Sequence, residues 1–151
     1  MDVATALKSC VLFKGFTDTG IQIFAGVCAP KQFPPGTPLF VENMVADSML
    51  IVAIGTVALS TKGRHGEDVS LGEVGPGDVL GEMSLMQPGQ RLCSAVARTP
   101  VVALEVRQTE FHKLLASKPQ ACVKLLMAVM ALFGQKLAEN RDALKSLAGR
   151  V

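Results

Sequence analysis

The sequence predicts an α+β fold that is mainly β, with an antiparallel sandwich or barrel between two helical regions. Short apolar segments separated by turn residues recur through residues 31–107, which is typical of an all-β core. Helical spacing of apolar residues precedes this region at 3–28 and follows it at 109–148. A chain of 151 residues has room for one domain of this kind, so residues 1–151 are expected to fold as a single unit.

The first region, 3–28, is predicted to hold two helices. Apolar residues such as Leu7 mark one face of the first helix. Thr17 can cap the second helix, because its hydroxyl is able to accept a hydrogen bond from a free backbone amide of the first turn. The run Pro34–Gly36 cannot continue a helix, so the helical region ends before it.

Six short segments are predicted to be strands, and each is bounded by residues typical of turns. These segments are Pro38–Glu42, Met49–Ile54, Thr56–Thr61, Val69–Val74, Ser94–Ala97 and Val101–Val106. The strand pattern stops between Gly81 and Arg91, where Glu82–Met86 has the composition of one helical turn. The interrupted segment is therefore the strongest candidate for a functional site.

The last region predicts a short helix followed by a long one. Pro119 suits the first turn of the long helix, which is expected to run without a break to Leu147, with Gly134 as its weak point. Its apolar residues lie on more than one face, so it needs a partner besides its own barrel. The partner expected is the same helix of a second subunit, in a homodimer, or a different protein.

Composition excludes several classes of function. The 15 Lys and Arg residues against 13 Asp and Glu leave a net charge of +2, which does not indicate the dense basic patch of a nucleic-acid-binding protein. The run Met49–Leu59, the longest nearly unbroken apolar one, is much shorter than the roughly 20 residues of a membrane span. The start, Met1–Ala4, lacks the basic region of a secretory signal. We therefore expect a cytoplasmic protein with no membrane and no nucleic-acid partner.

The reactive residue types do not form a catalytic or metal-binding pattern. The spacing of Cys10, Cys28, Cys93 and Cys122 does not match that of metal ligands, so they are expected to be buried, reduced thiols. The sequence also lacks a nucleophile–base pair and a Walker-type phosphate loop. It predicts a protein that is not an enzyme and holds no metal.

The segment from Gly75 to Val96 carries the chemistry of a ligand site. Its glycines let a ligand approach the backbone, and a helical turn that opens at Glu82 offers free amides to an anion. Arg91 adds a guanidinium that suits a phosphate. The Glu82 carboxylate would repel a phosphate but would accept hydrogen bonds from sugar hydroxyls. A ligand with both a sugar and a phosphate satisfies the two side chains together.

These residues resemble a known family. The run Gly81–Met86, then Arg91 nine residues after the glutamate, then a strand from Ser94, is similar to the phosphate-binding cassette of cyclic nucleotide-binding domains. The cassette corresponds to residues 81–94. Upstream segments are also similar to the family's motifs: Leu39–Glu42, Ala46–Val52, Gly55–Val57 and Gly77–Glu82. The family includes the catabolite activator protein, regulatory subunits of kinases and some ion channels. The resemblance implies a double-stranded β-helix, or jelly-roll barrel, with a long C-terminal helix.

The resemblance also implies a role for each site residue. Glu82 would accept a hydrogen bond from the ribose 2′-hydroxyl, and Arg91 would pair with the cyclic phosphate. Backbone amides of Ser84 and Cys93 would contact the phosphate, and Gly81 would let the ribose approach. The rest of the predicted ligand-binding set comprises the barrel residues Leu59, Leu71, Val74 and Leu80 and the cassette residues Met83 and Leu92.

Three positions depart from the family pattern. Gln90 stands where the family often has proline, and Cys93 replaces a common alanine. Leu92 lacks the threonine hydroxyl that helps other members bind guanine, so the predicted ligand is cAMP rather than cGMP. The bulk of Leu92 is also able to obstruct the pocket. The alternative prediction is therefore a degenerate domain that acts as a ligand-independent dimerisation or adaptor module.

The predicted function is a stand-alone sensor. In this family the long C-terminal helix closes over the base or forms a dimer seam, so the signal is expected to pass to a partner through this helix. Transcription factors of the family continue into a helix-turn-helix domain, whereas this sequence stops at Val151. The expectation is a cyclic nucleotide sensor without a DNA-binding domain of its own.

Overall fold

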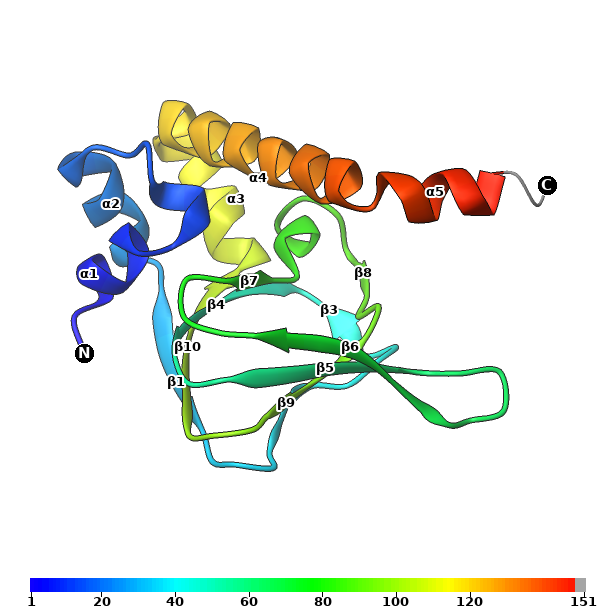
Figure 1. The fold of residues 1–151 in the computed structure, drawn as a ribbon. Helices are drawn as coiled ribbons and strands as arrows, with labels where there is room; N and C mark the ends of the chain where they lie inside the picture. The colour runs from blue at the N-terminus through cyan, green and yellow to red at the C-terminus, as the bar shows by residue number, and fades with distance from the viewer. Residues whose placement is uncertain (149–151) are drawn as a thin grey trace.

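The computed structural model describes residues 1–148, and its core is a barrel of two antiparallel four-stranded sheets (Figure 1). One sheet has the strand order β1-β10-β4-β7 and the other the order β2-β9-β5-β6, while β3 and β8 form a separate pair. The strands are β1 Ala29–Phe33, β2 Pro38–Phe40, β3 Val45–Ala46, β4 Ser48–Ile54, β5 Val57–Lys62, β6 Asp68–Val74, β7 Val79–Leu80, β8 Gly89–Gln90, β9 Ser94–Ala97 and β10 Val101–Arg107. Residues 149–151, the end of the predicted domain, lie outside the described residues.

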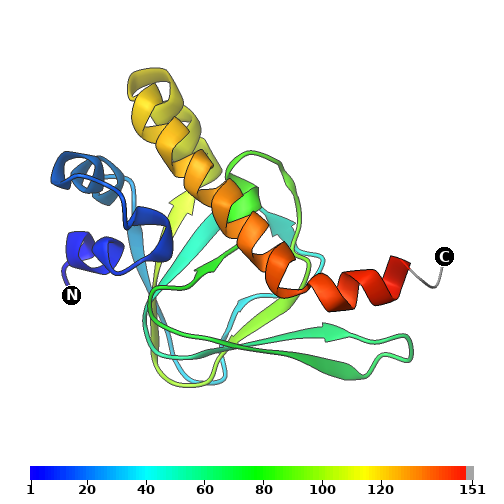
Figure 2. The same cartoon turned by 45° about the horizontal axis from the view of Figure 1, so that its top comes forward.

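Helices near both ends of the chain pack on one side of the barrel, whereas the last helix extends away from it (Figures 1 and 2). They are α1 Val3–Lys8, α2 Asp18–Ala25, α3 Gln108–Ser117, α4 Pro119–Glu139 and α5 Arg141–Ala148, with single 3-10 turns at η1 Val11–Phe13 and η2 Glu82–Leu85. The predicted antiparallel barrel with helices at both ends and a long C-terminal helix is confirmed, but the described residues hold more helix than strand, so the fold is mixed and not mainly β.

Strand β4 is buried on both faces, which explains why its sequence is a nearly continuous apolar run. Met49 and Ile51 point to the helical side and join its core, whereas Leu50 and Val52 point into the barrel. The run that begins at Met49 is therefore the central strand between two cores.

The helical core is built around aromatic rings. The Phe13 and Phe24 rings pack edge to face with their centroids 5.3 Å apart, and Phe111 is also fully buried. The Thr17 hydroxyl accepts a hydrogen bond from the Gly20 amide at 3.2 Å, so the predicted cap of α2 is confirmed. The N-terminal helices are thereby fixed against the sheet that carries β4.

The prediction that the four cysteines are buried is confirmed for two of them. Cys10 and Cys122 are buried in the helical core, and burial raises the pKa of the Cys10 thiol to about 11. Cys28 and Cys93, in contrast, are half-buried. A small thiol therefore serves as a core residue at two of the four positions.

The prediction of one unbroken helix from 119 to 147 is wrong. Pro119 does begin α4, but the helix ends at Glu139, and Asn140 leaves the helical conformation with φ −102° and ψ 19°. The Asn140 side-chain amide donates to the Lys136 carbonyl at 2.7 Å. This bond caps the carbonyl end of α4, so the chain turns there and not at Gly134.

The fully buried residues of α4 lie in its first half, and Leu132 of the second half is partly buried against the helical core. Cys122, Leu125 and Val129 are buried, and no α4 residue after Val129 is buried. The apolar residues Val123, Met127, Met130, Phe133 and Leu137 are exposed instead. By length and composition alone α4 is long and apolar enough to cross a membrane, unlike the shorter apolar run at 49–59. A helix that packs on the core of a soluble protein has the same properties.

Candidate functional site

The cassette opens with a sharp turn that only glycine adopts easily. Gly81 follows β7 in the left-handed conformation, with φ 71° and ψ 31°. The turn η2 begins at Glu82, as predicted, and buries Ser84 and Leu85. The Ser84 amide, expected to contact a phosphate, donates to the Gly81 carbonyl at 3.0 Å in this structure.

Arg91 lies inside the barrel wall rather than on the surface. Arg91 is only 7% exposed, and its guanidinium carbon lies 4.5 Å from the centre of the Phe40 ring. Its Nη1 donates to the Ser48 carbonyl at 2.9 Å, and its Nη2 donates to the Ser48 hydroxyl at 3.1 Å. A side chain on Gly81 would overlap Nη1, so Gly81 also makes room for the guanidinium.

A second polar layer holds Ser48. Its hydroxyl donates to Glu105 Oε2 at 3.0 Å, and Glu105 Oε1 pairs with Lys31 at 3.0 Å and with Arg107 at 3.3 Å. Burial raises the pKa of the Glu105 carboxyl, but the hydrogen bonds from Lys31 and Ser48 outweigh it and hold the pKa below its ordinary value. Glu105 therefore stays ionised behind the serine that holds Arg91.

The charge of Arg91 is left without a counter-ion. Within residues 1–148 no carboxylate forms an ion pair with it, and its buried Nε has no hydrogen-bond partner. Burial lowers the pKa of the guanidinium, while Asp47 and Glu105 oppose this from a distance. A buried cation with a free donor is a site where an anion is stabilised.

The other charged anchor, Glu82, faces α4. The Glu82 side chain is 15% exposed, and its Oε1 lies 3.3 Å from Lys136 Nζ. Met83 is exposed beside it. Leu92 is 90% exposed and points to solvent, so it does not obstruct the interior as its bulk suggested.

Most of the predicted apolar lining comes together in the barrel. Leu80 belongs to the buried barrel cluster, and Leu59, Val74 and Cys93 pack against it. Leu71 does not join this cluster, because β6 is an outer strand of its sheet and Leu71 is 53% exposed.

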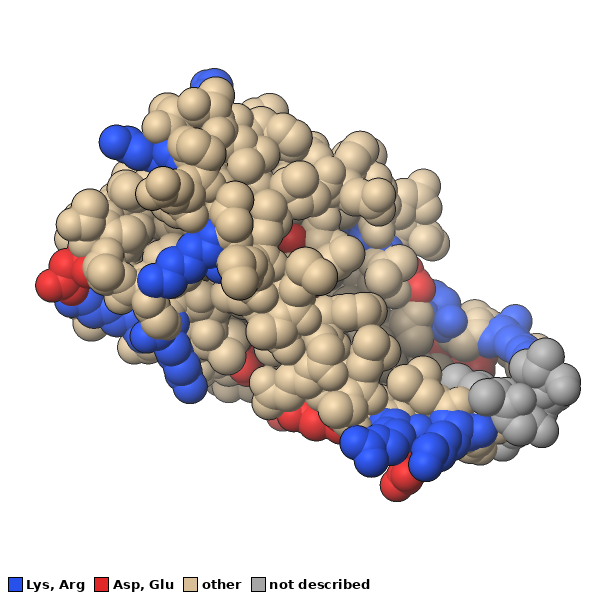
Figure 3. All heavy atoms as spheres, turned by 90° about the horizontal axis from the view of Figure 1, so that it is seen from above, with Lys and Arg blue, Asp and Glu red and all other residues tan. Residues whose placement is uncertain are grey.

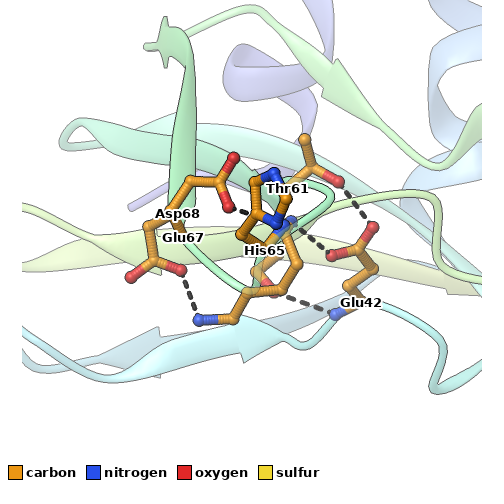
Figure 4. A network of polar contacts seen from close by, with 7 residues as sticks. Glu42, Thr61, His65, Glu67 and Asp68 are labelled. Carbon is orange, nitrogen blue, oxygen red and sulfur yellow. Dashed lines mark hydrogen bonds and ion pairs between the residues drawn. The ribbon is translucent and has the colours of Figure 1, made fainter.

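Sequence reasoning missed a polar network beside the cassette, shown in Figure 4. The Glu42 carboxylate accepts hydrogen bonds from the Thr61 hydroxyl at 2.5 Å and from the Lys62 amide at 3.0 Å, and these hydrogen bonds lower its pKa. The Glu42 amide donates to the Ser94 hydroxyl at 2.9 Å. Glu42 thereby ties the end of β2 to β5 and to the strand that leaves the cassette.

One hollow lies away from the predicted site. A cavity of about 510 Å³ lies between Phe16–Ile23 and the start of α4, and none of the predicted site residues lines it. Within residues 1–148, His, Cys, Asp and Glu side chains form no group that could hold a metal ion. The buried guanidinium of Arg91 remains the clearest feature that calls for a ligand.

Comparison with known proteins agrees with this geometry. The model of the cyclic nucleotide-binding domain family matches residues 30–118, which include the whole cassette. The chain belongs to the cyclic nucleotide-binding domain family. The resemblance seen in the sequence is thus confirmed.

Curated relatives include regulators of transcription. The chain is 29% identical over 115 residues to a CRP-like cAMP-activated global transcriptional regulator of Mycobacterium tuberculosis, covering 76% of this chain and 51% of that protein. It is 28% identical over 133 residues to the cyclic AMP receptor protein of Thermus thermophilus, covering 88% and 60%. The chain thus spans between half and two thirds of the length of these relatives.

A solved structure has the same architecture. The N-terminal domain of a transcriptional regulator from Streptomyces coelicolor superimposes with a TM-score of 0.78 at 27% identity, covering 92% of this chain and 94% of that one. The architecture of that domain therefore extends over nearly the whole of this chain.

The cassette turn gives a direct test of how Arg91 is placed. Gly81→Ala should destabilise the protein by about 1–2 kcal/mol from the left-handed conformation alone, and by more because the methyl group displaces Arg91. Gly89→Ala is the matched control, since a methyl group there meets no atom within 4 Å. Urea unfolding measures both, and equal stabilities of the two variants would contradict this description of the turn.

Proposed function

We propose that this chain is a sensor that binds a cyclic nucleotide at the cassette, cAMP in preference to cGMP. One observation carries the proposal: Arg91 is a buried cation that lacks a counter-ion in the described residues and has an unused Nε donor. A phosphate supplies both the missing charge and the missing acceptor.

The remaining cassette residues support the same class of ligand. Glu82, at the start of η2, offers a carboxylate to the ribose hydroxyls, and Gly81 leaves space at the backbone. Leu59, Val74 and Leu80 form an apolar surface suited to the rest of the nucleotide. Two relatives are named for cAMP, and Leu92 lacks a hydroxyl for guanine, so cAMP is the ligand proposed.

Calorimetry with cAMP and cGMP tests the proposal. The wild type should bind cAMP more tightly than cGMP, and Arg91→Gln should weaken cAMP binding by about 30-fold or more, since losing one partner of a buried charge pair costs about 2 kcal/mol or more.

Arg98→Gln is the matched control, because Arg98 is an exposed arginine paired with Glu73, and its cAMP affinity should equal that of the wild type. Thermal unfolding shows whether each variant is folded. No heat with either nucleotide would favour the alternative, a ligand-independent adaptor. Equal affinity of folded Arg91→Gln would contradict binding of the phosphate at Arg91.

The output of the sensor is proposed to pass through α4. Figure 3 shows a broad uncharged surface on the face seen from above. Its α4 residues are Val123, Met127, Met130, Phe133 and Leu137, which are exposed. Spacings of three and four residues put most of these side chains on one stripe of the helix, which is the pattern of a helix that packs on a partner. We propose a homodimer through this stripe, with a different protein as the other candidate partner.

Sedimentation velocity tests the dimer. Met130→Glu should shift the wild-type dimer to monomer, because the charge would be buried between the two helices. Val45→Glu on β3 is the control, since Val45 and Met130 are both 74% exposed, and it should leave the dimer intact. A wild-type monomer at all concentrations, with and without cAMP, would exclude the homodimer and leave a different protein as the partner.

A cytoplasmic location and action without nucleic acid remain predictions. One curated relative is named as a global transcriptional regulator, and this chain spans only 51% of its length.

A further inference from the structure

The barrel face of strand β10 changes from apolar to charged at Glu105. Val101 and Ala103 belong to the barrel cluster, and Glu105 and Arg107 follow them at spacings of two on the same face of the strand. The register pairs Arg107 with Ser48 of β4, so these polar residues lie at one end of the barrel. The Glu105 side chain is only 12% exposed there. Contact with solvent therefore does not explain a carboxylate at this position.

Glu105 fixes the direction of the Ser48 hydroxyl. A hydroxyl has one hydrogen, and a carboxylate only accepts, so this hydrogen points to Glu105 Oε2 at 3.0 Å. The lone pairs of the serine oxygen are left for Arg91 Nη2, which donates to it at 3.1 Å. The donors Lys31 and Arg107 occupy the other carboxylate oxygen, at 3.0 Å and 3.3 Å. The carboxylate thus reaches the arginine through the serine.

Ser48 occupies one edge of the Arg91 guanidinium and leaves the next edge free. Nη1 donates to the Ser48 carbonyl and Nη2 to the Ser48 hydroxyl, with one hydrogen each. The Nε–H and the second hydrogen of Nη2 form the side edge, where two parallel N–H groups match two oxygens of a phosphate. Nε is buried and has no hydrogen-bond partner within residues 1–148. The serine therefore decides which edge of the guanidinium a ligand meets.

We propose that Glu105 is a positioning residue of the ligand site, which acts through the Ser48 hydroxyl to hold the side edge of Arg91 toward the phosphate. The inference rests on the proposed function, because it assigns Arg91 to the phosphate. It gives Glu105 an effect opposite to that of its charge. A negative charge near the site repels an anionic ligand, so the carboxylate favours binding only because its hold on Ser48 outweighs the repulsion.

Calorimetry with cAMP on Glu105→Gln separates the two effects by their sign. In this variant the donors Lys31 and Arg107 take the amide oxygen, so the amide NH2 group faces Ser48 and the hydroxyl hydrogen loses its acceptor. The affinity for cAMP should fall about three- to tenfold, the range for one hydrogen bond. An affinity equal to or higher than that of the wild type would overturn the inference. Glu110→Gln is the matched control, because it removes an ion-paired carboxylate on α3 and should bind as the wild type does.

Variants of Ser48 show whether Glu105 acts through the serine. Ser48→Ala should weaken cAMP binding about tenfold, and adding Glu105→Gln to it should cause no further loss, because the hydroxyl that the carboxylate orients is gone. A further loss as large as in the wild-type background would contradict the inference. If thermal unfolding shows that Ser48→Ala does not fold, Ser48→Cys takes its place, since a thiol is a weak acceptor of similar size.

The Arg91 Nε–H signal in proton–nitrogen NMR spectra is a readout that a merely structural role of Glu105 would not move. This signal, assigned by its loss in Arg91→Gln, should shift when the wild type is saturated with cAMP, because Nε gains an acceptor. At saturation, Glu105→Gln should show a smaller shift, since the side edge is no longer held toward the phosphate. Equal shifts in the two proteins would overturn the positioning role.

The outcomes separate this inference from the proposed function. If the wild type binds cAMP and Arg91→Gln weakens binding while Glu105→Gln does not, only the inference fails. If the wild type binds no cyclic nucleotide, the proposed function fails and takes the inference with it.

Discussion

The structure is organised around a positive charge held out of water. Taking an arginine side chain into a barrel wall costs several kcal/mol unless polar groups replace its hydration. Here Ser48 supplies two oxygen acceptors, the Phe40 ring supplies a π face, and Gly81 leaves the necessary space. These groups hold the guanidinium without neutralising it. The electrostatic requirement that remains is the reason for proposing that the cassette binds an anion.

The two halves of the long helix α4 differ in how deeply they are buried. Its first half completes the helical core through Cys122, Leu125 and Val129, which anchors it to the sheet containing β4. In its second half, Leu132 packs against the helical core, Lys136 pairs with Glu82 of the cassette, and an apolar stripe is exposed. The proposed partner surface therefore lies on the helix that contacts the cassette.

The sequence was informative where local chemistry decides the structure. The η2 turn at Glu82, the Thr17 cap and the Pro119 helix start follow from short-range rules, and the cassette motif identifies the family. The partners of Arg91 and Glu82 could not be predicted, because Ser48 and Lys136 lie 43 and 54 residues away in the chain. The two-residue strands β3, β7 and β8 are too short for any periodic pattern. The end of α4 at Glu139 could not be predicted, because it depends on the local conformation of Asn140 rather than on a glycine.

A crystal structure of the chain grown with cAMP shows directly whether Arg91 receives the phosphate. We expect a cyclic phosphate oxygen within hydrogen-bonding distance of Arg91 Nε, the buried donor without a partner, and the ribose 2′-hydroxyl on Glu82. Nucleotide bound elsewhere, or an Arg91 Nε that stays unpartnered with cAMP present at saturating concentration, would contradict the proposed role of Arg91.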